Sequence, residues 1–217
     1  MRDDRIRYFA KNMDRLSRRD RVFLNNPVIM QGLGLAPVVI PATTLGNAFI
    51  LAVGVALLLT PTRMIATFIG QRTGSFLARA VTYALTAGVV YIGVGYIIDY
   101  LFGTGALAVG IYLPLLVLEP LIIKRYESPK RERLITSFKK GVITTIGFCL
   151  VLFLMAGLRE LLALGTLGGI EILRVSLLPM ASMPAGGFIL LGLVASLWRG
   201  LVNTFKKNIS LGVKNLQ

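Results

Sequence analysis

Long stretches of this chain contain no charged side chain, and no other feature limits its fold as strongly. Each is close to or above the roughly 18 to 20 residues that an α-helix needs to cross the hydrocarbon core of a bilayer. With 55% hydrophobic and only 16% charged residues, the chain lacks the polar surface of a soluble domain. We therefore predict an all-α membrane protein with several spans. The charge-free stretches are residues 22–62, 80–98, 100–118, 141–158 and 175–198.

Prolines, glycines and one polar segment divide these stretches. The first is about twice as long as one span, and Pro37 and Pro41 divide it. The polar segment 124–140 separates the two halves of the chain, and the glycine-rich loop 165–179 joins the last two spans. We predict six transmembrane helices, at about residues 27–42, 45–70, 79–98, 106–123, 141–162 and 184–204.

Lysine and arginine gather in segments that we expect on the cytoplasmic side, because basic loops are retained there. The N-terminal segment 1–24 and the loop 124–140 are the most basic, and the predicted loops after the first and third spans contain no basic residue. Six spans with both termini in the cytoplasm satisfy this pattern. We expect the segment 1–24 to lie on the membrane surface, held by anionic lipid, with docking to a soluble partner as the alternative.

The first and fourth predicted spans are each interrupted by a proline, Pro37 in the first and Pro120 in the fourth. Proline removes a backbone donor and clashes with the preceding turn, so each helix is expected to kink or unwind there. Proline also kinks many membrane helices without creating a site, which is the alternative interpretation. The residues at these two breaks are Leu35, Ala36, Pro37, Glu119 and Pro120.

Each broken span is the first of a three-span half, which is typical of transporters built from inverted repeats. We therefore predict that residues 25–103 form one three-helix repeat and residues 104–217 the second, inserted with the opposite orientation. The breaks are expected to meet near the middle of the membrane, at a site between the repeats.

Four motifs resemble, in order and spacing, the D/E-type membrane subunits of the Rnf and sodium-translocating Nqr complexes. The first reads Asn-Asn-Pro and continues through a Gln to Gly-Leu-Ala-Pro, where the family has Gly-Leu-Cys-Pro or a close variant. The other three contain Pro-Leu-Leu-Val, Arg-Glu-Leu-Leu followed by Gly-Thr-Leu, and Pro-Ala-Gly-Gly-Phe. They lie at residues 25–37, 114–117, 159–167 and 184–193.

The resemblance implies a six-span inverted-repeat subunit of a bacterial or archaeal cytoplasmic membrane that pairs with a paralogue of opposite topology. In the family, cysteines at the two breaks of each partner hold a two-iron two-sulfur cluster that passes electrons across the membrane. Here the family's cysteine positions fall on Ala36 and Pro120, and neither side chain can ligate iron. We expect no metal and no cofactor bound by this chain alone, with flavin or an iron-sulfur cluster in partner subunits.

Glu119 is the first candidate for a functional side chain. A carboxylate beside a proline break is costly within a membrane unless it is paired, hydrated or neutral, so it is a candidate for an ion or proton path. The alternative is that the fourth span ends nearby and Glu119 reaches the cytoplasmic interface. Both interpretations stay open at this point.

Arg159, Glu160 and Arg63 are the other charged residues within or beside predicted spans. Arg159 and Glu160 end the fifth span, where adjacent opposite charges indicate an interfacial anchor or, alternatively, members of the same ion or proton path as Glu119. Two positions are open for Arg63: within the second span or, as we expect, with its side chain extended to the cytoplasmic end of that span.

The residue types exclude several classes of function. The chain has no histidine, and we find no phosphate-binding glycine loop and no catalytic triad, so catalysis by this chain alone is not expected. The single cysteine, Cys149, lies in an apolar run and is interpreted as a packing residue. The net charge of +14 is divided among separate segments, which argues against nucleic-acid binding.

The sequence therefore indicates a membrane subunit of an Rnf/Nqr-like electron-transport or ion-translocating complex. Such a chain would be at most a non-catalytic subunit of a redox-driven translocase. Two alternatives stay open: a transporter that encloses a small solute or ion between the paired breaks, and a structural scaffold that orients other membrane proteins.

Overall fold

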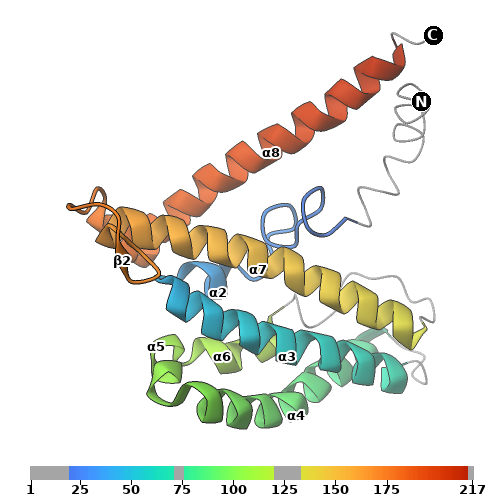
Figure 1. Ribbon diagram of the computed structural model, residues 1–217. Helices are drawn as coiled ribbons and strands as arrows, with labels where there is room; N and C mark the ends of the chain where they lie inside the picture. Colours follow the sequence, from blue (N-terminus) through green and yellow to red (C-terminus); the bar gives the residue numbers. More distant parts are fainter. Residues whose placement is uncertain (1–19, 71–75, 120–132, 215–217) are drawn as a thin grey trace.

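The computed structural model describes residues 20–70, 76–119 and 133–214, which are largely helical (Figure 1). Four helices in this part of the chain are long and apolar enough to cross a membrane. They coincide with the second, third, fifth and sixth predicted spans, so the all-α, multi-pass architecture is confirmed. They are α3 (Leu45–Gly70), α4 (Phe76–Phe102), α7 (Leu134–Leu164) and α8 (Pro184–Lys214).

α3 lies between α4 and α7 and packs against both (Figure 1). Leu51, Val55 and Leu58 follow one another at the spacing of helical turns and are fully buried, so α3 contributes the centre of the core. α8 diverges from the other three helices along its length and is the least buried of them (Figure 1).

The segment before α2 (Leu35–Val39) connects α8 to the bundle. The Trp198 indole N–H donates to the carbonyl of Phe23 at 3.0 Å, and Arg199 donates to the carbonyl of Ile29 at 2.8 Å. Asn26 is completely buried and donates to the carbonyl of Gly147 on α7 at 2.7 Å. The segment therefore lies between α7 and α8 and contacts both.

The first and fourth predicted spans are short helical pieces instead of continuous helices. α2 has 5 residues. In the fourth span, Gly110 has a φ of 51°, a conformation that interrupts the helix there. The described residues therefore contain four long helices rather than six, and the inverted repeat stays a prediction. The pieces of the fourth span are α5 (Ala106–Val109), α6 (Tyr112–Leu115) and the 3-10 turn η2 (Leu116–Leu118), preceded by η1 (Gly103–Gly105).

The expected break at Pro37 is wrong in its location. Pro37 lies in the first turn of α2, where its missing N–H is not needed for the helix. Gly34, with a φ of 69°, precedes the helix, and its left-handed conformation makes the break. Pro120 lies outside the described residues, but Glu119 before it is extended (φ −64°, ψ 133°), as the residue before a proline usually is.

Each short segment packs against the long helices of the other half of the chain. α2 contacts α7 and α8, whereas α5 contacts α3 and α4, and η2 contacts α4. The halves at 25–103 and 104–217 therefore interlock.

The predicted loop between the last two spans contains a small hairpin. Gly165, with a φ of 73°, ends α7, and strands β1 (Thr166–Leu167) and β2 (Ile170–Glu171) pair antiparallel. Gly168 and Gly169 form the turn with φ values of 62° and 83°, as a two-residue hairpin turn requires. The 3-10 turn η3 (Pro179–Ser182) then leads into α8.

Candidate functional site

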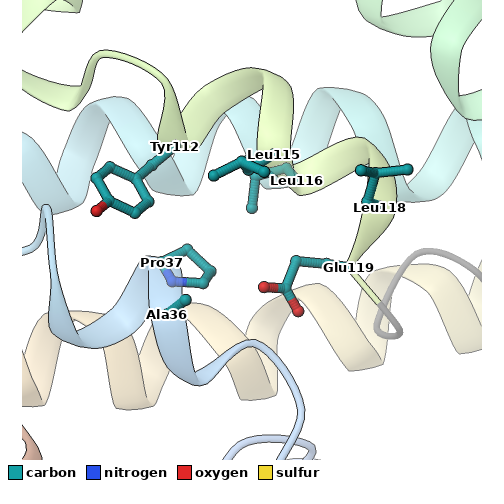
Figure 2. A pocket seen from close by; sticks show the side chains of 7 residues that line it. All are labelled: Ala36, Pro37, Tyr112, Leu115, Leu116, Leu118 and Glu119. Atoms are coloured by element: carbon teal, nitrogen blue, oxygen red, sulfur yellow. The ribbon is translucent and has the colours of Figure 1, made fainter.

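The two breaks meet at a small cavity. Its volume is about 170 Å³, and it lies between α2 on one side and α6 and η2 on the other (Figure 2). Of the residues predicted at the breaks, the structure brings Ala36, Pro37 and Glu119 into one lining. Leu35 is not part of the lining, and Pro120 lies outside the described residues. The full lining is Ala36, Pro37, Tyr112, Leu115, Leu116, Leu118 and Glu119.

Gly34 allows α2 to reach this position. A side chain at residue 34 would place its Cβ 2.6 Å from the ring of Phe148 on α7, which is too close for real atoms. Phe148 is itself completely buried. The absence of a side chain at Gly34 therefore lets the start of α2 lie directly against α7.

Glu119 is the ionisable carboxylate of the cavity wall. Figure 2 shows its carboxylate turned towards α2, on the side of Ala36 and Pro37. Glu119 thus places a carboxylate of the second break beside the residues of the first break.

The cavity residues do not fit a thiolate-bound iron-sulfur cluster. Iron in such a cluster needs cysteine thiolates, and the lining provides one carboxylate, one phenol and otherwise apolar groups. Cys149 lies on α7 among partly buried core residues and does not line the cavity. In the described part of the chain, no group of three or more potential metal-ligating side chains is present.

Arg159 lies inside the protein, so its interpretation as an interfacial anchor is wrong. Its side chain is fully buried and donates only to backbone carbonyls in the described residues. One guanidinium nitrogen bonds the carbonyls of Val39 and Ala42, the latter at 3.1 Å. The others bond Ala181 at 2.8 Å and Ser182 at 2.9 Å, both in η3. The guanidinium thus joins the end of α2 to the turn before α8.

Glu160 is also buried, with 3% of its surface exposed, so the same correction applies. One carboxylate oxygen accepts from the backbone N–H of Leu45, the first residue of α3, at 2.7 Å. The other accepts from Thr166 at 3.2 Å and from the backbone N–H of Gly169 at 3.1 Å. Glu160 thus joins the start of α3 to the hairpin.

Arg159 and Glu160 do not line the cavity that contains Glu119. That the three side chains belong to one ion or proton path stays a prediction. The sequence places both residues at the end of a span but does not reveal their backbone partners. Three of these partners, Val39, Ala42 and Leu45, lie 115 or more positions earlier in the chain. The feature of the sequence that could have indicated this site is a pair of adjacent opposite charges beside a glycine-rich loop.

A second polar cluster, also missed, lies between α3, α4 and α7. Arg63 is 2% exposed and donates to the Thr144 hydroxyl at 3.3 Å, so its expected extension to the membrane surface is wrong. The Thr67 hydroxyl lies 3.0 Å from that of Tyr83 and 2.9 Å from that of Ser137. These hydrogen bonds connect the three helices through polar groups in their interior.

Comparisons with known proteins match the chain to a family of membrane proteins. A family model described as "Rnf-Nqr subunit, membrane protein" matches residues 17–195. A protein of Shewanella oneidensis, named as the E component of an ion-translocating oxidoreductase complex, is 30% identical over an alignment of 190 residues, and the match covers 80% of this chain and 81% of the relative. Proteins with the same name from Shewanella piezotolerans and Shewanella frigidimarina are each 31% identical over 189 residues, with the same coverage.

Proposed function

The chain belongs to the Rnf-Nqr family of membrane subunits, and we propose that it is the E-type membrane subunit of an ion-translocating oxidoreductase complex. The observation that carries this proposal is the family match over residues 17–195, which includes both walls of the cavity. The relatives that share this match are named as the E components of such complexes and are covered over 81% of their length. In this proposal the chain is at most a non-catalytic subunit of a redox-driven translocase.

The proposal includes the six-span inverted repeat with both termini in the cytoplasm. The packing of the short segments supports the inverted repeat, because each packs against long helices of the other half. α2 contacts α7 and α8, and the 106–118 segment contacts α3 and α4. Such reciprocal packing is expected when two copies of one three-helix unit face each other across a pseudo-twofold axis. The basic segments 1–24 and 124–140 would then lie on the same side of the membrane.

The partner in this proposal is a paralogous six-helix subunit of opposite topology, together with redox subunits that contain flavin or iron-sulfur cofactors. Electrons would then pass through partner groups, since the break positions of this chain offer Ala36 and Pro120 instead of thiols. Anionic lipid at the basic N-terminal segment completes the expected surroundings.

Within such a complex, Glu119 is the residue that we propose for an ion or proton path. It is the carboxylate in the wall of a cavity that is otherwise mainly apolar. A carboxylate beside a helix break within a membrane can bind a proton or a small cation. The cavity volume of about 170 Å³ favours an ion or a few water molecules over an organic cofactor.

A transporter for a small solute is the second candidate, favoured by the same cavity between paired helix breaks. A structural scaffold subunit would need no ligand in the cavity. The three functions differ in what accompanies the chain and what stabilises it.

Purification of the tagged chain from its native membranes in mild detergent tests the proposal. The expected result is co-purification of a paralogous membrane subunit and of flavin or iron-sulfur proteins, identified by mass spectrometry, flavin fluorescence and iron analysis. Recovery of the chain alone, stabilised by a small solute, would support the transporter. Partners without any redox cofactor would support the scaffold.

A further inference from the structure

Two adjacent residues of α7 contact both ends of the link between α2 and α3. Arg159 donates to the carbonyls of Val39, the last residue of α2, and of Ala42 in the link. Glu160 accepts from the N–H of Leu45, the first residue of α3. The link is therefore fixed to α7 at its beginning and at its end.

The sign of each charge matches the helix end that it contacts. The last carbonyls of a helix have no partner within it and form its negative end, which a guanidinium complements. The first N–H groups form the positive end, which a carboxylate complements. Exchanging the two charges would place each against groups that it cannot bond, so the order Arg159 then Glu160 is part of the geometry.

α2 depends on such support because it is too short to be stable alone. It has 5 residues, and a single helical turn has little intrinsic stability. Its start is set by Gly34 against Phe148, and its end by Arg159. Ala36 and Pro37, which line the cavity, lie between these two points.

We propose that Arg159 and Glu160 are positioning residues that hold the α2–α3 link against α7 and thereby set the place of Ala36 and Pro37 in the cavity wall. This role does not depend on which ion or cofactor the complex uses. It assigns a shared purpose to two buried charges that the cavity itself does not contain.

α8 encloses the guanidinium from the other side. A Cβ added at Gly187 would lie 3.1 Å from Cζ of Arg159 and 2.9 Å from a methyl group of Val39. Glycine at this position therefore leaves the space in which Arg159 reaches the end of α2. Replacing Gly187 by alanine disturbs the arrangement without removing either charge.

The test measures local accessibility in the complete chain in native membranes. Cys149→Ala removes the single thiol, and Ala36→Cys places a new one in the cavity wall. The rate of its modification by N-ethylmaleimide is compared among Arg159→Gln, Arg159→Lys, Glu160→Gln and Gly187→Ala backgrounds. A thiol at Ile135, at the start of α7 and outside the predicted spans, is the reference, since that side chain is 70% exposed.

Position 36 is partly buried, so local opening should increase its reactivity. The expected result is a rate at position 36 at least about tenfold higher with Arg159→Gln, and several-fold higher with Glu160→Gln and Gly187→Ala. The reference rate should not change. Arg159→Lys should give an intermediate rate, because an ammonium keeps the charge but cannot reach carbonyls on both sides at once.

A destabilised control separates positioning from general loosening. Leu59→Ala removes a fully buried side chain of α3 that makes none of these hydrogen bonds. The proposal is overturned if Leu59→Ala raises the rate at position 36 as much as Arg159→Gln does, or if Arg159→Gln leaves that rate within twofold of the parent. Should Arg159→Gln fail to accumulate, the same criteria apply to Gly187→Ala and Glu160→Gln.

Discussion

At the level of single residues, two glycines before α2 allow the cost of a left-handed backbone to be distinguished from the cost of a steric clash. Gly32 and Gly34 share a φ of 69°, but only at Gly34 would a Cβ meet Phe148, while nothing lies within 4 Å at Gly32. Gly32→Ala is therefore expected to cost about 1 kcal/mol, the usual penalty of a left-handed conformation. Gly34→Ala adds a clash with a fully buried ring and should cost at least about 1 kcal/mol more.

Thermal unfolding of both variants in detergent measures the difference. Phe148→Leu in the Gly34→Ala background should recover part of the loss from the clash, but none of the loss from strain. Equal effects of the two alanine variants would contradict the contact between Gly34 and Phe148.

Glu119 yields a prediction about activity. Glu119→Gln keeps the size of the side chain but removes its charge and its ability to release a proton. Ion transport by membrane vesicles that contain the complex should fall by about tenfold or more, in keeping with the dependence of membrane ion paths on ionisable groups.

Glu171→Gln in the hairpin is the matched control, because that residue is exposed and lies outside the cavity. It should leave transport unchanged. Full transport by Glu119→Gln would remove this residue from the ion path.

The contacts of individual side chains are the feature that the sequence predicts least completely. The meeting of Ala36, Pro37 and Glu119 follows from a pattern of paired breaks. The burial of Arg159 and Glu160 does not, because their partners are backbone groups of α2, η3 and the start of α3. A backbone carbonyl carries no sequence signature, so only the fold reveals such a site.

At the scale of helices, apolar length is a reliable guide. The second predicted span, 45–70, coincides with α3, and α7 and α8 contain the fifth and sixth with extra turns at their polar ends. Short segments are harder to predict. In the first span the sequence indicates a break at Pro37, whereas the structure has the break at Gly34. Pro61 lies inside α3 without ending it, which shows how strongly packing overrides a local preference.

Glycines within the long helices should respond to alanine with opposite signs. A Cβ at Gly54 of α3 would lie 2.8 Å from a methyl group of Leu113, so Gly54→Ala should push the 112–116 segment away and destabilise the protein by about 1 to 3 kcal/mol. Gly93 of α4 has nothing within 4 Å, so Gly93→Ala should stabilise it by about 0.5 to 1 kcal/mol. Thermal unfolding of the two variants side by side checks this, and a gain of stability for Gly54→Ala would contradict the packing of α3 against Leu113.

At the scale of the whole molecule, α8 leads to a prediction about which side of the membrane each of its ends faces. The hairpin lies just before α8, and the helix is long enough to cross a bilayer. A thiol at Ile170, which is 71% exposed, should therefore react with a membrane-impermeant maleimide in intact cells, whereas one at Lys214 should react only after permeabilisation. Both variants carry Cys149→Ala. Labelling of both from the same side would contradict the proposed topology.

The interlocked packing of α2 with α7 and α8, and of the 106–118 segment with α3 and α4, also bears on biosynthesis. As the chain leaves the ribosome, its first half enters the membrane before the helices that will enclose α2 have been translated. A truncated product ending after α4 would leave α2 without the helices that it packs against, and membrane proteases would be expected to degrade it. Two separately synthesised fragments should survive only when they are made together.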